Sequence, residues 1–153
     1  MTEHENNADL WNSFQIINSY YAKRPTAKSS EMTALPAVQC MLGLLNQLEI
    51  NSFSSFEKSC LQTAHAYWLK NAKELEVDMI SQCNTLEAQI DYRAQQKNHH
   101  QICLTQVLSI DKDHFDDLPE FFENIHLAGL PIKTILKTIG HHFNHISELK
   151  HLD

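Results

Sequence analysis

Three polar side chains near the end of the sequence have a spacing that could bind a metal ion. His141, His145 and Glu148 follow one another at i, i+4 and i+7. On an α-helix these positions lie within roughly 60° of one another, because each residue turns the helix by about 100°. Two imidazoles and a carboxylate are ligands that Zn²⁺ and similar ions accept. The polar face supplies neither a fourth ligand nor a supporting hydrogen-bond partner, so a solvated surface is preferred and no metal or other cofactor is predicted.

Other histidines fit catalytic or oxygen-binding motifs poorly. The segment at His141 is not the H-E-x-x-H motif of zinc proteases, because a second histidine occupies the place of the glutamate. Two pairs, Glu123/His126 and Glu148/His151, have the E-x-x-H spacing of di-iron helical proteins, but the apolar positions of the predicted 55–96 helix carry no carboxylate that would complete such a site. The neighbours His99 and His100 would point to different sides of a helix.

The sequence also lacks the motifs of nucleophilic catalysis and phosphate binding. It has no G-x-S-x-G, and its three glycines cannot build a Walker or dinucleotide-binding loop. Cys40, Cys60, Cys83 and Cys103 are spaced by 20, 23 and 20 residues, without any C-x-x-C. Each cysteine falls in an apolar helical pattern, where a thiol acts as a small hydrophobic side chain. We therefore expect a protein that is not an enzyme, in the reducing environment of the cytoplasm.

Charge and hydropathy narrow the classes of partner. The 153 residues carry 12 basic and 19 acidic side chains, for a net charge of −7, and no cluster of Lys and Arg. Nucleic acid is therefore not an expected partner. The longest strongly apolar run, residues 40–45, is too short to span a membrane. The acidic N-terminal segment is no secretory signal, although export without a cleaved signal stays open.

Few turn-forming residues interrupt the chain, and this favours long helices. Among 153 residues only three are Gly and four are Pro. We predict a single all-α domain over residues 1–153, with a frayed N-terminus at 1–7 and a mobile polar linker at 23–36. The first predicted helix runs from residue 9 to the linker, because apolar residues recur at three- and four-residue spacing: Leu10, Trp11, Phe14, Ile17 and Tyr21. A second helix is predicted from about 35 to 50. For residues 102–110 a helix is preferred, and a short strand is the alternative.

The longest predicted element is one amphipathic helix over about residues 55–96. Ser54 and Glu57 have the spacing of a capping box at its start. Apolar residues then recur as three triplets, each shifted by 11 positions: Leu61, Ala64, Trp68; Ala72, Leu75, Met79; and Cys83, Leu86, Ile90. This period of about 3.67 residues keeps one apolar face along a nearly straight helix or a right-handed coiled coil; chance in an ordinary helix is the alternative. We expect five or six helices in a bundle organised along this helix.

Two helices are predicted after residue 117. Asp117 is expected to cap the first, with Glu120 at its third position, and Gly129 to end it. Pro131 should open the last helix, whose apolar stripe continues to Leu149.

The segment FDDLPEFFENI (115–125) combines acidic and aromatic residues. Such segments can dock into a groove of a partner protein. Packing of Phe121 and Phe122 in the core is the preferred interpretation.

The stretches MLGLLNQ (41–47) and FEKSCLQTAHAYWLKNAKEL (56–75) combine a short helix, a turn and a long Gly-free amphipathic helix. This order, with E-K-x-x-L-Q-type spacing, resembles the phasins, helical proteins that coat polyhydroxyalkanoate granules. The resemblance covers residues 41–100 and departs from the family in composition, because phasins are Ala-rich and this chain is rich in His, Asn and Gln. It implies a surface-active coat protein on hydrophobic granules.

The preferred function is that of a non-catalytic interaction protein. An adaptor, a chaperone or a self-assembling oligomer would bury the apolar face of the 55–96 helix on a protein partner or on a second copy. We predict Tyr67, Trp68, Met79 and Ile90 as partner-binding residues, because aromatic and Met side chains dominate interface energies. A phasin-like coat protein and a metal-binding helical protein that uses the C-terminal histidines are the alternatives.

Overall fold

The chain is helical wherever it is described. The computed structural model describes residues 3–23, 31–49, 51, 53–91, 98–111 and 113–152, and these contain no strand. The predicted all-α class is therefore confirmed. The elements are α1 (Glu3–Ala22), α3 (Glu31–Leu45), α4 (Ser55–Leu69), η2 (Lys73–Leu75), α5 (Glu76–Gln89), α6 (His99–Leu108), α7 (His114–Leu127), α8 (Ile132–His142) and η3 (Lys150–Leu152).

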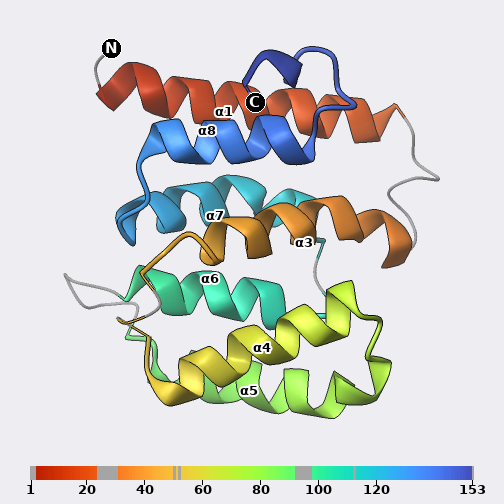
Figure 1. Cartoon of the computed structure of the whole chain (residues 1–153), viewed down its shortest axis with the longest axis vertical. Helices are drawn as coiled ribbons and strands as arrows, with labels where there is room; N and C mark the ends of the chain where they lie inside the picture. The colour runs from red at the N-terminus through yellow and green to blue at the C-terminus, as the bar shows by residue number, and fades with distance from the viewer. Residues whose placement is uncertain are drawn as a thin grey trace.

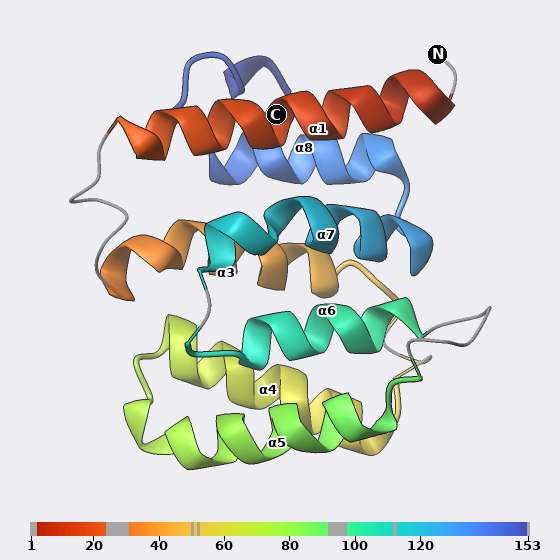
Figure 2. The same cartoon turned by 180° about the vertical axis from the view of Figure 1, so that it is seen from behind.

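The helices lie in tiers across the long axis of the molecule (Figure 1). The pair α1 and α8 forms one end, α3 and α7 come next, then α6, and α4 and α5 form the other end; the view from behind shows the same order (Figure 2). One hydrophobic core runs through all tiers. Helix α3 contacts α4, α6, α7 and α8, so it joins the two halves of the stack.

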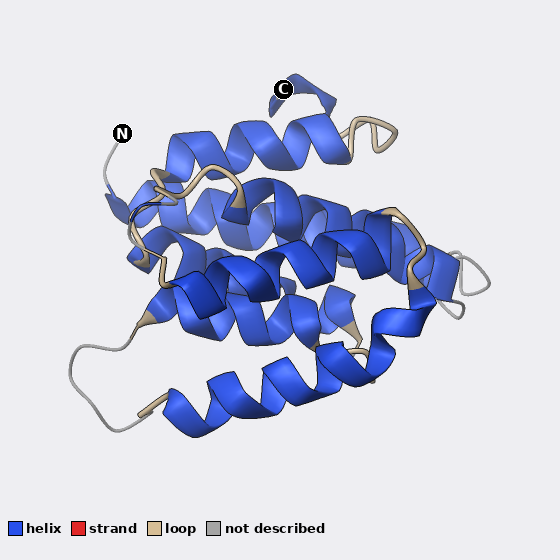
Figure 3. Cartoon of the chain, turned by 60° about the horizontal axis from the view of Figure 1, so that its bottom comes forward, coloured by secondary structure: helices blue, strands red, loops and turns tan. Residues whose placement is uncertain are grey.

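The predicted single helix over 55–96 is wrong, because the chain turns back after Leu69. Asn71 has a φ of 55°, in the left-handed region that stops an α-helix, and α5 then returns beside α4. Asparagine visits this region more readily than most residues, since its short polar side chain can hydrogen-bond locally. The N–H groups of Lys70 and Ala72 both donate to the carbonyl oxygen of Ala66, so backbone hydrogen bonds close the C-terminal end of α4. Figure 3 shows the molecule with the end that contains α4 and α5 turned toward the viewer. The break also explains why seven α-helices are described instead of five or six.

The helix boundaries near the C-terminus differ from the prediction in two places. Helix α7 begins at His114, because the carboxylate of Asp113, not that of Asp117, accepts the hydrogen bond of an N-cap, from the N–H of Phe115 at 3.0 Å. Gly129 follows the helix with a φ of 122°, as expected for a terminating glycine. Helix α8 stops at His142, and its predicted stripe continues through turns that still bury Phe143, Ile146 and Leu149.

The predicted terminal and linker segments are only partly described. Helix α1 begins at Glu3, within the segment expected to fray. Residues 24–30 of the predicted linker lie outside the described residues, and its last part belongs to α3, which contains Pro36. None of the described helices has the length and apolar character needed to cross a membrane.

The reversal at Asn71 gives a test of the helical hairpin. We expect Asn71→Gly to change the free energy of unfolding by less than about 0.5 kcal/mol, and Asn71→Val to lower it by about 1–2 kcal/mol, because a β-branched side chain is strained at positive φ. Asn84→Val, at an exposed position within α5, is the control and should cost only a few tenths of a kcal/mol. Urea unfolding measures all three. Equal losses for the two valine variants would contradict the turn at Asn71.

Candidate functional site

The predicted partner-binding residues lie mostly inside the protein. Tyr67, Trp68 and Met79 are buried, and Ile90 is half-buried at the end of α5. The indole N–H of Trp68 donates to the carbonyl oxygen of Val107 in α6 at 2.8 Å. These four side chains are thus largely covered by the chain's own helices, and they present little surface to a partner in this structure.

The candidate metal ligands do not share one helix face. His141 is in the last turn of α8, whereas His145 and Glu148 lie beyond its end, so the helical spacing that motivated the site does not apply. His141 lines a hollow with Gly43 and Lys137; the other two line a different hollow beside α1. Among the described residues, no group of three His, Cys, Asp or Glu side chains is placed to hold one metal ion.

His145 instead belongs to an aromatic cluster on α1. Its Nε2 lies 3.1 Å from the hydroxyl oxygen of Tyr21, and its ring meets the ring of Tyr20 edge-on at 5.4 Å. Burial, with a smaller effect from Tyr20, raises the pKa of Tyr21 to about 12. The phenol therefore stays protonated, and the contact holds the C-terminal segment against α1.

The four cysteines are buried and reduced. Burial raises the pKa of Cys40 and of Cys103 above the ordinary thiol value, and that of Cys60 to about 11. A thiol is nucleophilic as the thiolate. These side chains therefore pack as small hydrophobic groups, in the way the sequence indicates.

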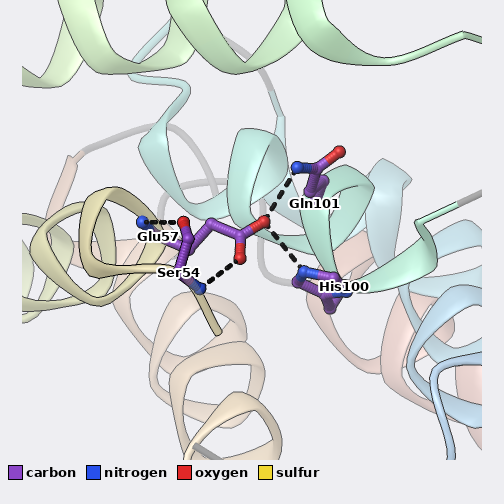
Figure 4. Close-up of polar contacts among 4 residues, drawn as sticks. All are labelled: Ser54, Glu57, His100 and Gln101. Atoms are coloured by element: carbon purple, nitrogen blue, oxygen red, sulfur yellow. Dashed lines mark hydrogen bonds and ion pairs between the residues drawn. The ribbon is translucent and has the colours of Figure 1, made fainter. Parts of the chain in front are cut away.

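The strongest polar cluster joins the beginnings of α4 and α6 (Figure 4). The predicted capping box is present, with the Ser54 hydroxyl accepting from the Glu57 N–H at 3.1 Å and a Glu57 carboxylate oxygen accepting from the Ser54 N–H at 2.7 Å. The other carboxylate oxygen of Glu57 accepts from Nε2 of His100 and from Nε2 of Gln101, both at 2.8 Å. The ring of Phe53 stacks on His100 at 5.1 Å.

This cluster has a clear structural role. Burial raises the pKa of the Glu57 carboxyl, but the hydrogen bonds it accepts and the nearby imidazole outweigh that effect and hold the pKa below its ordinary value. The carboxylate also lies beside the first turn of α6, where the helix dipole favours negative charge. Neither Glu57 nor His100 is among the residues that line the five principal surface hollows of the described part of the chain. The cluster fixes α4 to α6.

A groove between α1 and α7 has the surface expected of a binding site. It has a volume of about 520 Å³ and is lined by Leu10, Trp11, Pro119, Glu120, Phe122, Glu123, His126 and Leu127. Leu10 and Phe122 are buried, whereas Trp11 is 51% exposed and Leu127 is 54% exposed. Large apolar side chains that share one exposed groove indicate an interaction site more strongly than apolar side chains scattered singly over the surface. The sequence placed Trp11 in the apolar stripe of its helix and gave no sign that it would lie at the surface.

A second exposed apolar set lies at the opposite end of the stack. Leu69 at the end of α4 is 44% exposed, and Val77 and Ile80 on α5 are 75% and 43% exposed. Val77 and Ile80 are three residues apart, so they share one face of α5. This set, which we call the hairpin patch, lines none of the larger grooves beside α1.

The Glu57 cluster predicts a characteristic loss of stability in acid. We expect Glu57→Gln to lower the free energy of unfolding by about 1–3 kcal/mol at neutral pH, because the charge-assisted hydrogen bonds are lost. The folded-state pKa of Glu57 is lowered, so its contribution is complete above the ordinary carboxyl value of about 4.5 and is lost as the pH falls through the folded-state pKa. The difference between wild type and variant should therefore shrink below that pH in urea titrations.

The control for this experiment is Glu74→Gln, at an exposed position in η2. It should leave the free energy of unfolding within about 0.5 kcal/mol of wild type. A Glu57→Gln difference that stays constant through the acid range would contradict the lowered pKa.

Comparison with known proteins found no matching family model, no matching curated protein and no matching solved structure. The likeness of residues 41–100 to phasins therefore stays a prediction from the sequence.

Proposed function

We propose that this chain is a non-catalytic interaction protein that docks a protein partner in the groove between α1 and α7. The observation that carries the proposal is the placement of two large, half-exposed apolar side chains, Trp11 and Leu127, along one groove with a buried apolar floor. Tryptophan is among the residues that contribute most to binding when a partner covers them.

A partner that binds in this groove would remove apolar side chains from water, which favours binding. Complete burial of an exposed side chain of the size of Leu or Phe contributes about 1.5–3 kcal/mol, and Trp11 and Leu127 still have about half of their surface to bury. The ring of Trp11 lies 5.4 Å from that of its neighbour Phe14, which is not itself among the residues that line the groove. The groove therefore offers a partner apolar area at little cost in side-chain entropy, because aromatic side chains have few rotatable bonds.

This proposal keeps the function expected from the sequence and moves its site. Tyr67, Trp68 and Met79 are already covered by the chain itself, so the physical reason for a partner there is gone. The same type of side chain, aromatic and large aliphatic, is exposed at α1 and α7 instead. The buried, reduced cysteines support a cytoplasmic setting, which is part of the proposal.

The second candidate function is a phasin-like coat protein that adsorbs to a hydrophobic surface. The hairpin patch supports it, because Val77 is 75% exposed at one end of the stack and Leu69 and Ile80 also lie at the surface. Adsorption would bury this outer patch, and no specific groove would be needed.

Charge substitutions in the groove test the docking function. We expect Trp11→Glu and Leu127→Glu to deplete the same co-purifying proteins by roughly thirtyfold, because loss of an interface anchor costs about 2 kcal/mol or more. Quantitative mass spectrometry after affinity purification of the full chain measures this. Val77→Glu, equally a charge at an exposed apolar position, is the matched control and should keep those proteins. Identical protein sets for all three variants would refute docking at the groove.

Adsorption to oil droplets tests the coat function, with substitutions in the hairpin patch as the test and Trp11→Glu as the control. If the hairpin patch adsorbs, Val77→Glu combined with Ile80→Glu should abolish partition of the purified protein to triglyceride droplets, and Trp11→Glu should leave it unchanged. Sedimentation of the droplets and gel densitometry give the bound fraction. A wild-type protein that stays in the aqueous phase would rule out the coat function and leave docking at the groove unaffected.

A further inference from the structure

We propose that the groove between α1 and α7 selects a basic amphipathic helix of a protein partner. An apolar residue of that helix would pack between Trp11 and Leu127, and its Lys or Arg residues would lie opposite Glu120 and Glu123. This inference rests on the proposed function and specifies the chemistry of the partner.

The first observation is an acidic stripe on the outer face of α7. Asp116, Glu120, Glu123 and Leu127 are all exposed and are spaced by four, three and four residues. At this spacing they share one side of the helix. The stripe begins with carboxylates and ends at the apolar side chain of the groove. A partner that reaches Leu127 along α7 therefore passes the acidic side chains.

The second observation is the absence of compensating charge in the described part of the groove. Its lining contains Glu120 and Glu123, no Lys or Arg, and the histidine His126, whose Nδ1 lies 2.9 Å from the carbonyl oxygen of Leu130. No ion pair of either glutamate is found among the described residues. Lys133 and Lys137 line a different hollow, together with carboxylates of their own. The net charge of −7 adds to the negative potential at the groove.

The geometry favours a helix over an extended peptide. The groove runs between two helices, and acids at four- and three-residue spacing match cations at the same spacing on a second helix. Binding of an extended strand uses the free edge of a sheet. The described residues contain no strand, so they offer no such edge.

The chain's own α8 carries Lys133 and Lys137 at i and i+4, so a second copy is the competing occupant. In the folded protein, however, these lysines share their hollow with Asp9 and Glu148. Their charge is locally balanced, whereas that of Glu120 and Glu123 is not. A foreign basic helix is therefore the better complement.

Selection from a display library identifies the helix sequence that the groove prefers. The probe is a phage-displayed library of amphipathic helices, with anchor positions varied among Leu, Phe, Trp and Ala and outer positions varied among Lys, Gln and Glu. Selection on the full-length protein, with Trp11→Glu as counter-selection, should enrich Lys at outer positions beside a large anchor. Enrichment of Gln or Glu at those positions, or no enrichment of any helix, would overturn the proposal.

Fluorescence anisotropy of the most enriched peptide then tests the role of the two glutamates. Glu120→Lys with Glu123→Lys should weaken binding by roughly tenfold or more, because two attractive contacts become repulsive. Glu74→Lys with Glu76→Lys makes the same change in net charge at exposed positions of the hairpin and should have a much smaller effect. Affinity should also fall as the salt concentration rises. Equal effects of both double variants would overturn the proposal.

Trp11 provides an independent readout, because the other tryptophan, Trp68, is buried. Bound peptide should protect the exposed indole from acrylamide quenching, and Trp11→Phe should remove this signal. A peptide with Gln outer positions that protects Trp11 equally well, at any salt concentration, would refute selection for basic residues and leave docking at the groove intact.

Analytical ultracentrifugation tests whether a second copy of the chain occupies the groove. Self-association that is abolished by Lys133→Glu with Lys137→Glu would assign the groove to a second copy and overturn the proposal.

Discussion

The fold depends on the burial of α6. From Ile102 to Leu108 every residue of this helix is buried, so the helix has no side that can face water. A helix that is buried on every side requires neighbours in every direction, and α3, α4, α5 and α7 supply them. The two helices α4 and α5 can both reach α6 only if the chain between them reverses. The turn at Asn71 is therefore a consequence of covering α6.

Several polar groups within and beside α6 form hydrogen bonds, and these offset part of the free-energy cost of burying them. The hydroxyl of Thr105 donates to the carbonyl oxygen of Ile102 at 2.6 Å, which satisfies it within the helix. At the exposed beginning of α6, His100 and Gln101 donate to Glu57. Their partner carboxylate is itself held by the capping box of α4, so the first turn of α4 serves as the polar anchor of α6. These hydrogen bonds satisfy the Thr105 hydroxyl and the Glu57 carboxylate, whereas Oε1 of the buried Gln106 has no hydrogen-bond partner among the described residues.

The sequence predicts the local features of this fold well and its long-range features poorly. The capping box at Ser54, the terminating Gly129 and the apolar positions of α4 and α5 follow from chemistry within a few residues. The reversal at Asn71 does not, because the triplets of apolar residues keep their phase across it and neither Gly nor Pro interrupts the helix. A periodic pattern shows which side of a helix needs covering. It does not show whether another protein or the same chain covers it.

The candidate site illustrates the same limit. Trp68 and Trp11 both belong to apolar stripes in the sequence, yet Trp68 hydrogen-bonds inside the core and Trp11 lies in an open groove. The difference is decided by the neighbouring helices, which no local pattern specifies. The histidines of the last 14 residues are separated because the chain leaves the helix after His142 and continues in turns that bury Phe143, Ile146 and Leu149.

The walls of the groove differ in their attachment to the rest of the protein. Helix α7 packs against α3 and α6 in the middle of the stack, whereas α1 lies at one end and contacts α7 and α8. An end helix with few neighbours is the type of segment that opens first in local unfolding. A molecule wedged between α1 and α7 would act as a clamp, because its binding free energy also opposes detachment of α1. Occupancy of the groove would thereby slow amide hydrogen exchange along α1, and the ordering of that helix would be thermodynamically linked to the presence of the ligand.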